Sequence, residues 1–256
     1  MRVRVLGAHN LETGGARHTC FLIDGVLGID AGSLVSSLSL VEQGEIRALL
    51  ITHQHFDHAR DIPTLGLTTM GSPKPIHLYG LPATLESVHA HFLDGLVYPD
   101  LTKGLNDTPP RFRSHSVEPD VAFETLGYTV KPVAASHPVP AVGYIVKSPS
   151  GRCVAYTGDT DGDLLPILQD ELAPEVVFVD VTYPNRLQWR AEVSGHLTPS
   201  LLERQLGEAL RAGVRLPKIV PVHLSLQERD EIHQELSAVA KVLGVDLTPG
   251  YEDMML

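Results

Sequence analysis

Three histidines and one aspartate lie within six residues of this chain, at His53, His55, Asp57 and His58. An apolar run at 48–51 comes directly before them and is typical of a buried strand. Packing alone seldom requires such a cluster, whereas neutral imidazoles and carboxylates are the ligands that Zn²⁺, Fe²⁺ or Mn²⁺ bind. The spacing therefore predicts a metal site at the end of this strand, rather than a histidine-rich surface loop.

Three further candidate ligands each stand just after a strand-like apolar run. His137 follows V-A-A-S, Asp159 follows V-A-Y-T-G and His223 follows I-V-P-V. Taken singly, such residues are more often cap or turn residues. Strand ends on one edge of a sheet converge, so ligands far apart in the sequence can meet there. Beside the 53–58 motif, we expect all three to join the metal site.

The elements expected to position these residues are strands joined by tight turns and covered by helices. Strands are expected at 2–7, 19–23, 26–29, 48–52, 76–79, 121–125, 128–135, 142–147, 153–157, 176–181 and 218–222, with a short one near 245–247. Helices are expected at 34–43, 58–70, 82–91, 161–170, 199–212 and 227–243. Because hairpin signals such as Asp24-Gly25 join neighbouring strands, an α/β sandwich is favoured over a doubly wound parallel sheet.

The length of 256 residues is sufficient for one large domain, which we expect to span 1–256. Residues 94–119 are rich in Pro, Gly, Asp and Asn without a visible period, and they are expected to form a long loop insertion. A lid, a substrate-facing segment and a dimer arm are the alternatives for it, so a homodimer is among the expected assemblies. Residues 182–197 are also expected to be a loop.

Composition indicates an ordinary globular protein, with 43% hydrophobic and 20% charged residues. The net charge of −11 does not favour an extended basic surface for a nucleic-acid polymer. No apolar run approaches the length of a membrane span, and the first residues do not resemble a signal peptide. These features predict a soluble, cytoplasmic protein without a membrane partner, in which Cys20 and Cys153 are buried free thiols.

The candidate ligands, taken in order, resemble those of the metallo-β-lactamase-fold hydrolases, and Asp30 in I-D-A-G matches that superfamily's usual strand-end aspartate. The resemblance implies a four-layer αββα sandwich with two divalent metal ions between the sheets, Zn²⁺ being favoured over Mn²⁺ or Fe²⁺. Carried over residue by residue, it assigns His53, His55 and His137 to one ion, Asp57, His58 and His223 to the other, and Asp159 as the bridge.

Hydrolysis is the reaction that this resemblance implies. Two metals about 3.5–4 Å apart hold a bridging hydroxide and neutralise a charged transition state. Asp57 would help to orient that hydroxide, and Asp30 would position the ligand loop. The substrate stays open at this point, because the superfamily includes lactamases, thioesterases, lactonases and nucleases.

Two stretches narrow the choice of substrate. The first is A-S-H-P-V-P-A-V-G-Y at 135–144, and the second is V-D-V-T-Y-P-N-R at 179–186, followed by S-G-H-L-T-P-S-L-L at 194–202. Both are similar to the class II cyclic-nucleotide phosphodiesterases, which usually have Glu where this chain has Asp180. His196 stands just ahead of a predicted helix, for which Thr198 is a suitable N-cap and Pro199 a suitable first residue. The N-terminus of such a helix attracts phosphate. We expect His196 to protonate the leaving sugar oxygen and Asp180 to orient it, the alternative being a cap-region histidine bonded to backbone.

The expected function is therefore hydrolysis of 3′,5′-cyclic AMP or GMP to the 5′-monophosphate, with the small cyclic nucleotide as partner. The alternatives are tRNA 3′-end processing, cleavage of other small cyclic phosphates, and a lactonase or thioesterase activity that would leave Asp180 and His196 unexplained. His9 and His18 are kept as substrate contacts. The other histidines are expected to have structural roles; they are His77, His89, His91, His115 and His233.

Overall fold

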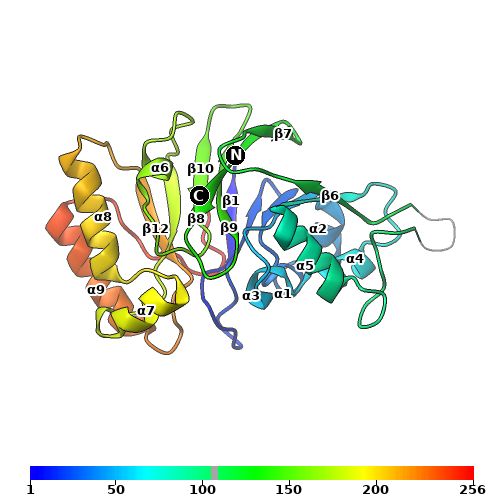
Figure 1. Ribbon diagram of the computed structural model, residues 1–256, viewed down its shortest axis with the longest axis horizontal. Helices are drawn as coiled ribbons and strands as arrows, with labels where there is room; N and C mark the ends of the chain where they lie inside the picture. Colours follow the sequence, from blue (N-terminus) through cyan, green and yellow to red (C-terminus); the bar gives the residue numbers. More distant parts are fainter. Residues whose placement is uncertain (105–108) are drawn as a thin grey trace.

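Two six-stranded sheets pack face to face in the computed structural model, which describes residues 1–104 and 109–256 (Figure 1). The first sheet has the order β1 (Val3–Gly7), β2 (Cys20–Ile23), β3 (Leu27–Ile29), β4 (Ala48–Leu50), β5 (Ile76–Gly80) and β6 (Phe112–Ser116). The second has the order β12 (Lys218–Val222), β11 (Val176–Asp180), β10 (Cys153–Tyr156), β9 (Ala141–Lys147), β8 (Tyr128–Ala135) and β7 (Phe123–Thr125).

The first sheet changes from antiparallel to parallel pairing along its order. β1, β2 and β3 form an antiparallel meander, whereas β3 to β6 are parallel neighbours. The predicted hairpin between β2 and β3 is confirmed, because Asp24 and Gly25 both have positive φ angles, 49° and 77°. Two such residues give the turn a twist that matches its strands. The parallel pairing brings the carboxyl ends of β3 and β4 to one edge of the sheet.

The second sheet has the same mixed character. β7, β8, β9 and β10 pair antiparallel, and β10, β11 and β12 pair in parallel. Because β8 and β10 both run antiparallel to β9, their carboxyl ends share an edge with those of β11 and β12. Four chain segments therefore leave this sheet on the same side.

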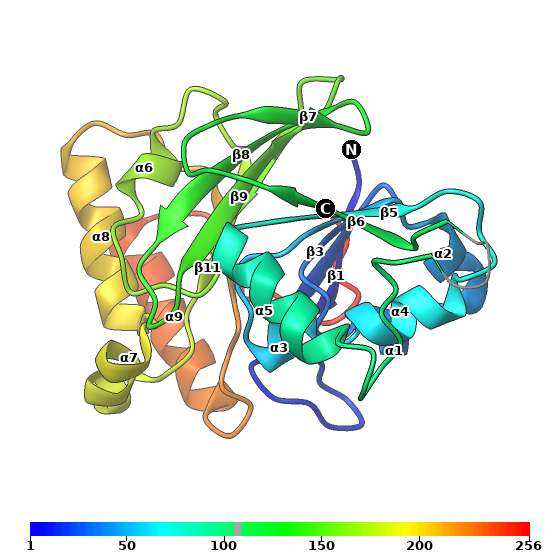
Figure 2. The same cartoon turned by 45° about the vertical axis from the view of Figure 1, so that its right-hand side comes forward.

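Helices cover the outer face of each sheet. Beside the first sheet lie α1 (Leu34–Ser37), α2 (Leu40–Glu45), α3 (Phe56–Ala59), α4 (Ile62–Thr68) and α5 (Pro82–Phe92), and beside the second lie α6 (Leu165–Leu168), α7 (Gln188–Ser194), α8 (Pro199–Arg211) and α9 (Arg229–Leu243) (Figure 2). Buried apolar side chains fill the space between the sheets and both outer interfaces. The expected four-layer αββα sandwich is confirmed.

The helix predicted at 34–43 is instead two helices, α1 and α2. Ser39 caps α2, because its hydroxyl accepts from the Glu42 backbone N–H while the Glu42 carboxylate accepts from the Ser39 N–H. This reciprocal pair starts a new helix. Gly44 lies inside α2 rather than ending it. The helix predicted at 58–70 is likewise divided between α3 and α4.

The segment 94–119 contains the edge strand β6, which the sequence did not predict. Only Phe112 of its five residues is buried, so no alternation of apolar and polar residues marks it as a strand. Its parallel pairing with β5 is a long-range contact and could not be predicted from the local sequence. Residues 105–108 of this segment lie outside the described residues.

The predicted loop at 182–197 is wrong in part, because it contains the 3₁₀ turn η1 (Asn185–Leu187) and α7. α7 buries only Ala191, so it lacks an apolar period, and Gly195 ends it at a φ of 71°. The helix predicted at 161–170 shortens to α6. The strand predicted near 245–247 is reduced to one bridge between Leu247 and Ile219.

Two global expectations can be compared with the structure. Cys20 and Cys153 are buried and free, as predicted. Among the helices of 1–104 and 109–256, none combines the length and the hydropathy needed to cross a bilayer.

Candidate functional site

The predicted site residues meet at the shared carboxyl edge of the two sheets. In the first sheet, Asp30 follows β3 and the 53–58 motif follows β4. In the second, His137 follows β8, Asp159 follows β10, Asp180 ends β11 and His223 follows β12. Every predicted ligand therefore lies in the segment that follows a strand whose direction is set by pairing, and this is how residues 170 positions apart, His53 and His223, become neighbours.

One group of side chains contains His53, His55 and His137. Their imidazole nitrogens face one another within 4.8 Å. His55 Nδ1 lies 2.9 Å from His53 Nε2 and 3.2 Å from His137 Nε2. The Gly195 carbonyl accepts from His137 Nδ1 at 3.1 Å, which orients that ring and leaves Nε2 for the group.

A second group contains Asp57, His58 and His223. Asp57 Oδ2 lies 3.2 Å from His223 Nε2 and 3.5 Å from His58 Nε2. Asp159 lies between the two groups, since its Oδ2 is 3.2 Å from His58 Nε2, 3.4 Å from His223 Nε2 and 3.8 Å from His53 Nε2. This position is the one that the bridging assignment requires.

The donor set and its packing fit divalent metal. His58 Nε2 is buried and makes no well-aligned hydrogen bond, although Asp159 Oδ2 lies 3.2 Å away, and this geometry suits a cation between them. Several imidazole nitrogens and carboxylate oxygens converge on the same space, and borderline cations such as Zn²⁺ bind this combination. The cluster therefore fits a metal site.

Asp30 positions two residues of the first sheet's part of the site through buried hydrogen bonds. Its carboxylate is fully buried and accepts from His58 Nδ1 at 2.7 Å, from the Thr52 backbone N–H and from the Thr52 hydroxyl. Thr52 Oγ1 in turn lies 3.0 Å from His53 Nδ1. Gly32 is required in the same I-D-A-G turn, because a Cβ there would lie 1.8 Å from the Asp57 carbonyl oxygen.

Asp180 and His196 form a buried pair next to these groups. His196 Nδ1 donates to Asp180 Oδ2 at 2.7 Å, and Asp180 is fully buried. Burial would lower the pKa of His196, but the facing Asp180 carboxylate raises it above its usual value. The His196 ring lies 5.2 Å from that of His223 and 5.3 Å from that of His137, so the pair adjoins both groups.

The local sequence around His196 adopts the predicted helix start. Thr198 is the N-cap of α8, its hydroxyl accepting from the Leu201 N–H, and Pro199 is the first helical residue. The partner of His196 Nδ1 is nevertheless the Asp180 carboxylate, so the alternative of a histidine bonded only to backbone does not describe this ring.

Charge is balanced within the cluster. Burial depresses the pKa of His53 well below its usual value. Burial would raise the pKa of Asp159, yet the facing His223 and His58 hold it well below its usual range. His223 is buried too, but Asp159, Asp180 and Asp57 raise its pKa to about 10. The carboxylates therefore favour bound cations, and metal ions replace protons in such sites.

Sequence reasoning missed the threonines of the site. Thr182 Oγ1 donates to Asp180 Oδ1 at 2.6 Å and lies 2.8 Å from His223 Nδ1, so it joins the buried pair to a predicted ligand. The Thr160 backbone N–H donates to Asp180 Oδ2 at 3.0 Å. The available signal was a threonine inside or beside an apolar strand end, as in I-T-H and D-V-T.

Four histidines outside the motif and the predicted ligand set can be located in the structure. His77 and His115, on β5 and β6, face each other at 2.8 Å, outside the cluster. His9 Nδ1 pairs with Glu252 at 2.7 Å. His18 lies at the site's border, where the nearby Asp57 opposes the lowering of its pKa by burial. The expected roles of His9 and His18 in substrate contact stay predictions.

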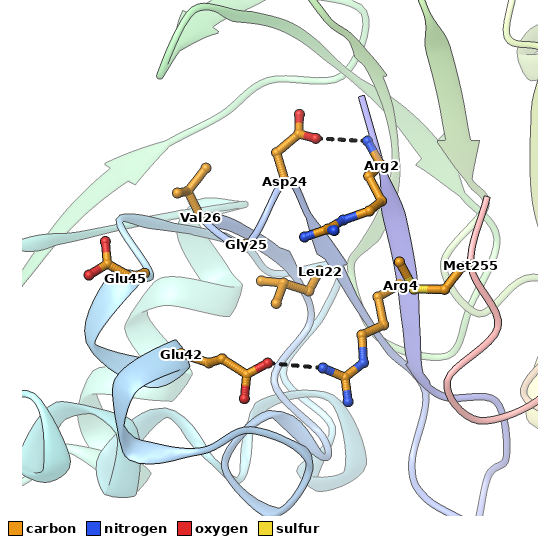
Figure 3. Close-up of a pocket in the computed structure, with 9 residues that line it drawn as sticks. All are labelled: Arg2, Arg4, Leu22, Asp24, Gly25, Val26, Glu42, Glu45 and Met255. Atoms are coloured by element: carbon orange, nitrogen blue, oxygen red, sulfur yellow. Dashed lines mark hydrogen bonds and ion pairs between the residues drawn. The ribbon is translucent and has the colours of Figure 1, made fainter.

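A separate cavity of about 280 Å³ lies beside the first residues of β1 and contains none of the predicted site residues (Figure 3). Arg4 in its wall is already paired with Glu42 and Asp253, at 3.1 and 2.7 Å. Because this cavity contains no histidine and lies apart from the cluster, we assign the chemistry to the histidine cluster instead.

Comparisons with known proteins show what this chain is similar to. The chain is 31% identical to ribonuclease Z of Mycobacterium sp. (strain KMS) over 154 residues, which cover 55% of this chain and 51% of that protein. It thus spans about half the length of this curated relative. Its fold is similar to that of unliganded yeast PDE1, with a TM-score of 0.80, 18% identity, and coverage of 100% of this chain and 98% of that one.

A third similar protein is Zn(2+)-bound PqqB from Methylobacterium extorquens, with a TM-score of 0.72, 17% identity, and coverage of 100% and 99%. At these identities the two structural likenesses show the fold alone. A sequence model of the family described as "Beta-lactamase superfamily domain" matches residues 19–241. Since this match spans most of the chain and the two-sheet architecture agrees with it, the chain belongs to the β-lactamase superfamily and has the metallo-β-lactamase fold.

Proposed function

We propose that this chain is a metal-dependent phosphodiester hydrolase that opens 3′,5′-cyclic nucleotides to their 5′-monophosphates. The observation that carries the proposal is the buried Asp180–His196 pair, 2.7 Å apart and adjoining both histidine groups. A proton donor beside a metal site suits a reaction whose leaving group is a poor alkoxide. An acyl hydrolase would require the cluster but not this pair.

The proposed metal ligands are the two groups described above, with Asp159 shared between them. Divalent ions, Zn²⁺ being favoured, would supply Lewis-acid activation of water and neutralise charge on the phosphate. Asp57 is placed to orient the attacking water, because it lies in one group and is still partly exposed. Asp30 keeps His58 and Thr52 in position through its buried hydrogen bonds.

His196 is proposed to donate its proton to the 3′-oxygen that leaves phosphorus. Asp180 accepts from Nδ1 and is itself held by Thr182 and the Thr160 N–H, so the Nε2 side of the ring is left for substrate. The raised pKa of His196 keeps the proton available near neutral pH. Asp180 is thus a positioning residue, although the resemblance would have a glutamate there.

RNA 3′-end processing is a second candidate, supported by the name ribonuclease Z of the curated relative. It requires the same phosphodiester chemistry and the same residues. The net charge of −11 supports a small substrate over a long polymer, because polymer binding depends on many Lys and Arg contacts.

The substrate is tested by giving metal-loaded protein cyclic AMP, cyclic GMP, a 3′-extended tRNA precursor and a thioester. We expect turnover of the cyclic nucleotides, measured as 5′-monophosphate release. Cleavage of the tRNA precursor alone would replace the first candidate by the second. Turnover of the thioester alone would contradict both.

The role of His196 is tested with His196→Ala, whose matched control is His115→Ala, a partly buried histidine outside the cluster. General acids contribute about 10²–10⁴-fold, so His196→Ala should lose that much of kcat while keeping its metal content. His115→Ala should retain its activity. A His196→Ala enzyme within a few-fold of wild type would refute the proton-donor role.

A further inference from the structure

Phe56 is an exposed aromatic residue inside the ligand motif. It stands between His55 and Asp57 as the first residue of α3, and 64% of its surface is exposed. The largest buried phenylalanines, Phe21, Phe112 and Phe178, fill the core instead. Other large apolar side chains are at least as exposed, Leu40 and Trp189 among them, so what distinguishes Phe56 is its position between two proposed ligands.

A second aromatic ring supports Phe56. Phe92, the last residue of α5, stacks on it with 6.2 Å between the ring centroids and 25° between the planes. α5 is anchored through buried Leu85 and Val88, and Phe92 packs against the outer core of the first sheet. Figures 1 and 2 both show α5 beside α3. The pair thus forms a supported ring surface rather than a loose side chain.

We propose that the Phe56–Phe92 pair is a stacking platform for the nucleobase of the substrate, an inference that rests on the proposed function for the position of the phosphate. Adjacent Cα atoms are about 3.8 Å apart, so the platform starts beside two residues of the metal groups. In the proposed arrangement, a nucleotide with its phosphate at the cluster would have its base on Phe56. Because any base can stack on an aromatic ring, the platform would select nucleotides over sugar phosphates without distinguishing adenine from guanine.

The platform is tested by calorimetric titration of the metal-loaded protein with AMP, ribose 5-phosphate and butyl phosphate. AMP and ribose 5-phosphate differ only in the base, and butyl phosphate offers an apolar group that cannot stack. We expect AMP to bind about 10-fold or more tightly than either of the others, within the range known for one stacked base. In Phe56→Ala and Phe56→Leu the preference for AMP over ribose 5-phosphate should disappear, the leucine variant keeping apolar volume without the ring.

The matched control is Leu40→Ala, on α2, where another large apolar side chain is 71% exposed. It should keep the AMP preference. Equal binding of AMP and ribose 5-phosphate by the wild type would overturn the platform, and butyl phosphate binding as tightly as AMP would replace stacking by a general apolar contact. A preference for AMP that survives both Phe56 variants would also overturn it.

The same measurements separate this inference from the proposed function. Turnover of phosphodiesters without an AMP preference would leave the proposed function standing and reject the platform. A Phe56-dependent AMP preference in a protein that hydrolyses no phosphodiester would support the platform and reject the proposed function.

Discussion

The two sheets build their parts of the site in different ways. The first sheet supplies four candidate ligands from six residues, 53–58, in the segment after β4. The second supplies one each from the ends of β8, β10 and β12. The first part is thus local in sequence, whereas the second requires three strands to be paired in register before any two ligands meet.

Despite this difference, both parts contain the same hydrogen-bonded arrangement. Each has a fully buried aspartate at a strand end, which binds one threonine hydroxyl and one histidine: Asp30 with Thr52 and His58, and Asp180 with Thr182 and His196. The two parts differ in the position of this histidine relative to the proposed metal ligands. His58 faces the ligand cluster, while His196 is outside the proposed ligands, so only the second sheet leaves an oriented histidine for proton transfer.

The largest expected effect on metal content and activity comes from substituting Asp159, the residue that lies between the two parts of the site. Asp159→Asn removes charge from the carboxylate that faces His53, His58 and His223. We expect a loss of metal content and a fall in activity beyond the roughly 10²–10⁴-fold expected for His196→Ala. Metal analysis of the purified variant beside its kinetics is the check. Full metal content with near-normal turnover would show that the two parts work without a bridge.

A smaller effect on metal affinity is expected from Asp30→Asn, which weakens the hydrogen bonds that orient the ligands of the first sheet only. Asparagine tolerates the φ of 58° at this position and keeps an acceptor, but it loses the charge that orients His58. Such supporting partners typically change metal affinity by about 10–100-fold. Competition with a chelator of known affinity measures the change. An unchanged affinity would mean that the motif after β4 orients its ligands unaided.

Thr182→Val tests the second part at a single hydroxyl, with Thr52→Val as its counterpart in the first sheet. The loss of a buried hydrogen bond costs about 1–3 kcal/mol, which corresponds to roughly 10-fold in rate if Asp180 then misplaces His196. Thr182→Val should lower kcat more than metal affinity, although its hydroxyl also faces His223, whereas Thr52→Val should lower mainly metal affinity through His53 and Asp30. Equal effects of the two variants on kcat and on metal affinity would remove the functional distinction between the sheets.

The smallest effect concerns stability at Asp61, a largely buried carboxylate near the first part, with a side chain 13% exposed. Burial raises its pKa to about 6, although the Val35 N–H and Arg60 oppose that rise. Since the folded protein holds this proton more tightly, stability should fall by roughly 2 kcal/mol between about pH 4 and pH 6. Asp61→Asn should remove this component, as measured by denaturant unfolding at both pH values. The prediction would be contradicted if the free energy of unfolding changed by the same amount between about pH 4 and pH 6 in the wild type and in Asp61→Asn.

The sequence identified most of the site because its residue types are rare in combination. The H-x-H-x-D-H spacing needs no tertiary information, and the isolated His137, Asp159 and His223 could be predicted because each follows an apolar strand. The strands themselves were predictable where both faces are buried, as in β9 and β11. Elements with one buried residue, such as β6 and α7, carried no such pattern and were missed.

The sequence by itself determined the ligand types, their spacing and the strand ends that carry them, because these follow from local residue chemistry. Only the tertiary structure decided which atoms meet: that Asp159 lies between the two groups, that Thr182 links Asp180 to His223, and that Phe56 stacks on Phe92. Those contacts join residues up to 106 positions apart, as between His53 and Asp159. They depend on strand register and sheet packing, which no local stretch of sequence specifies.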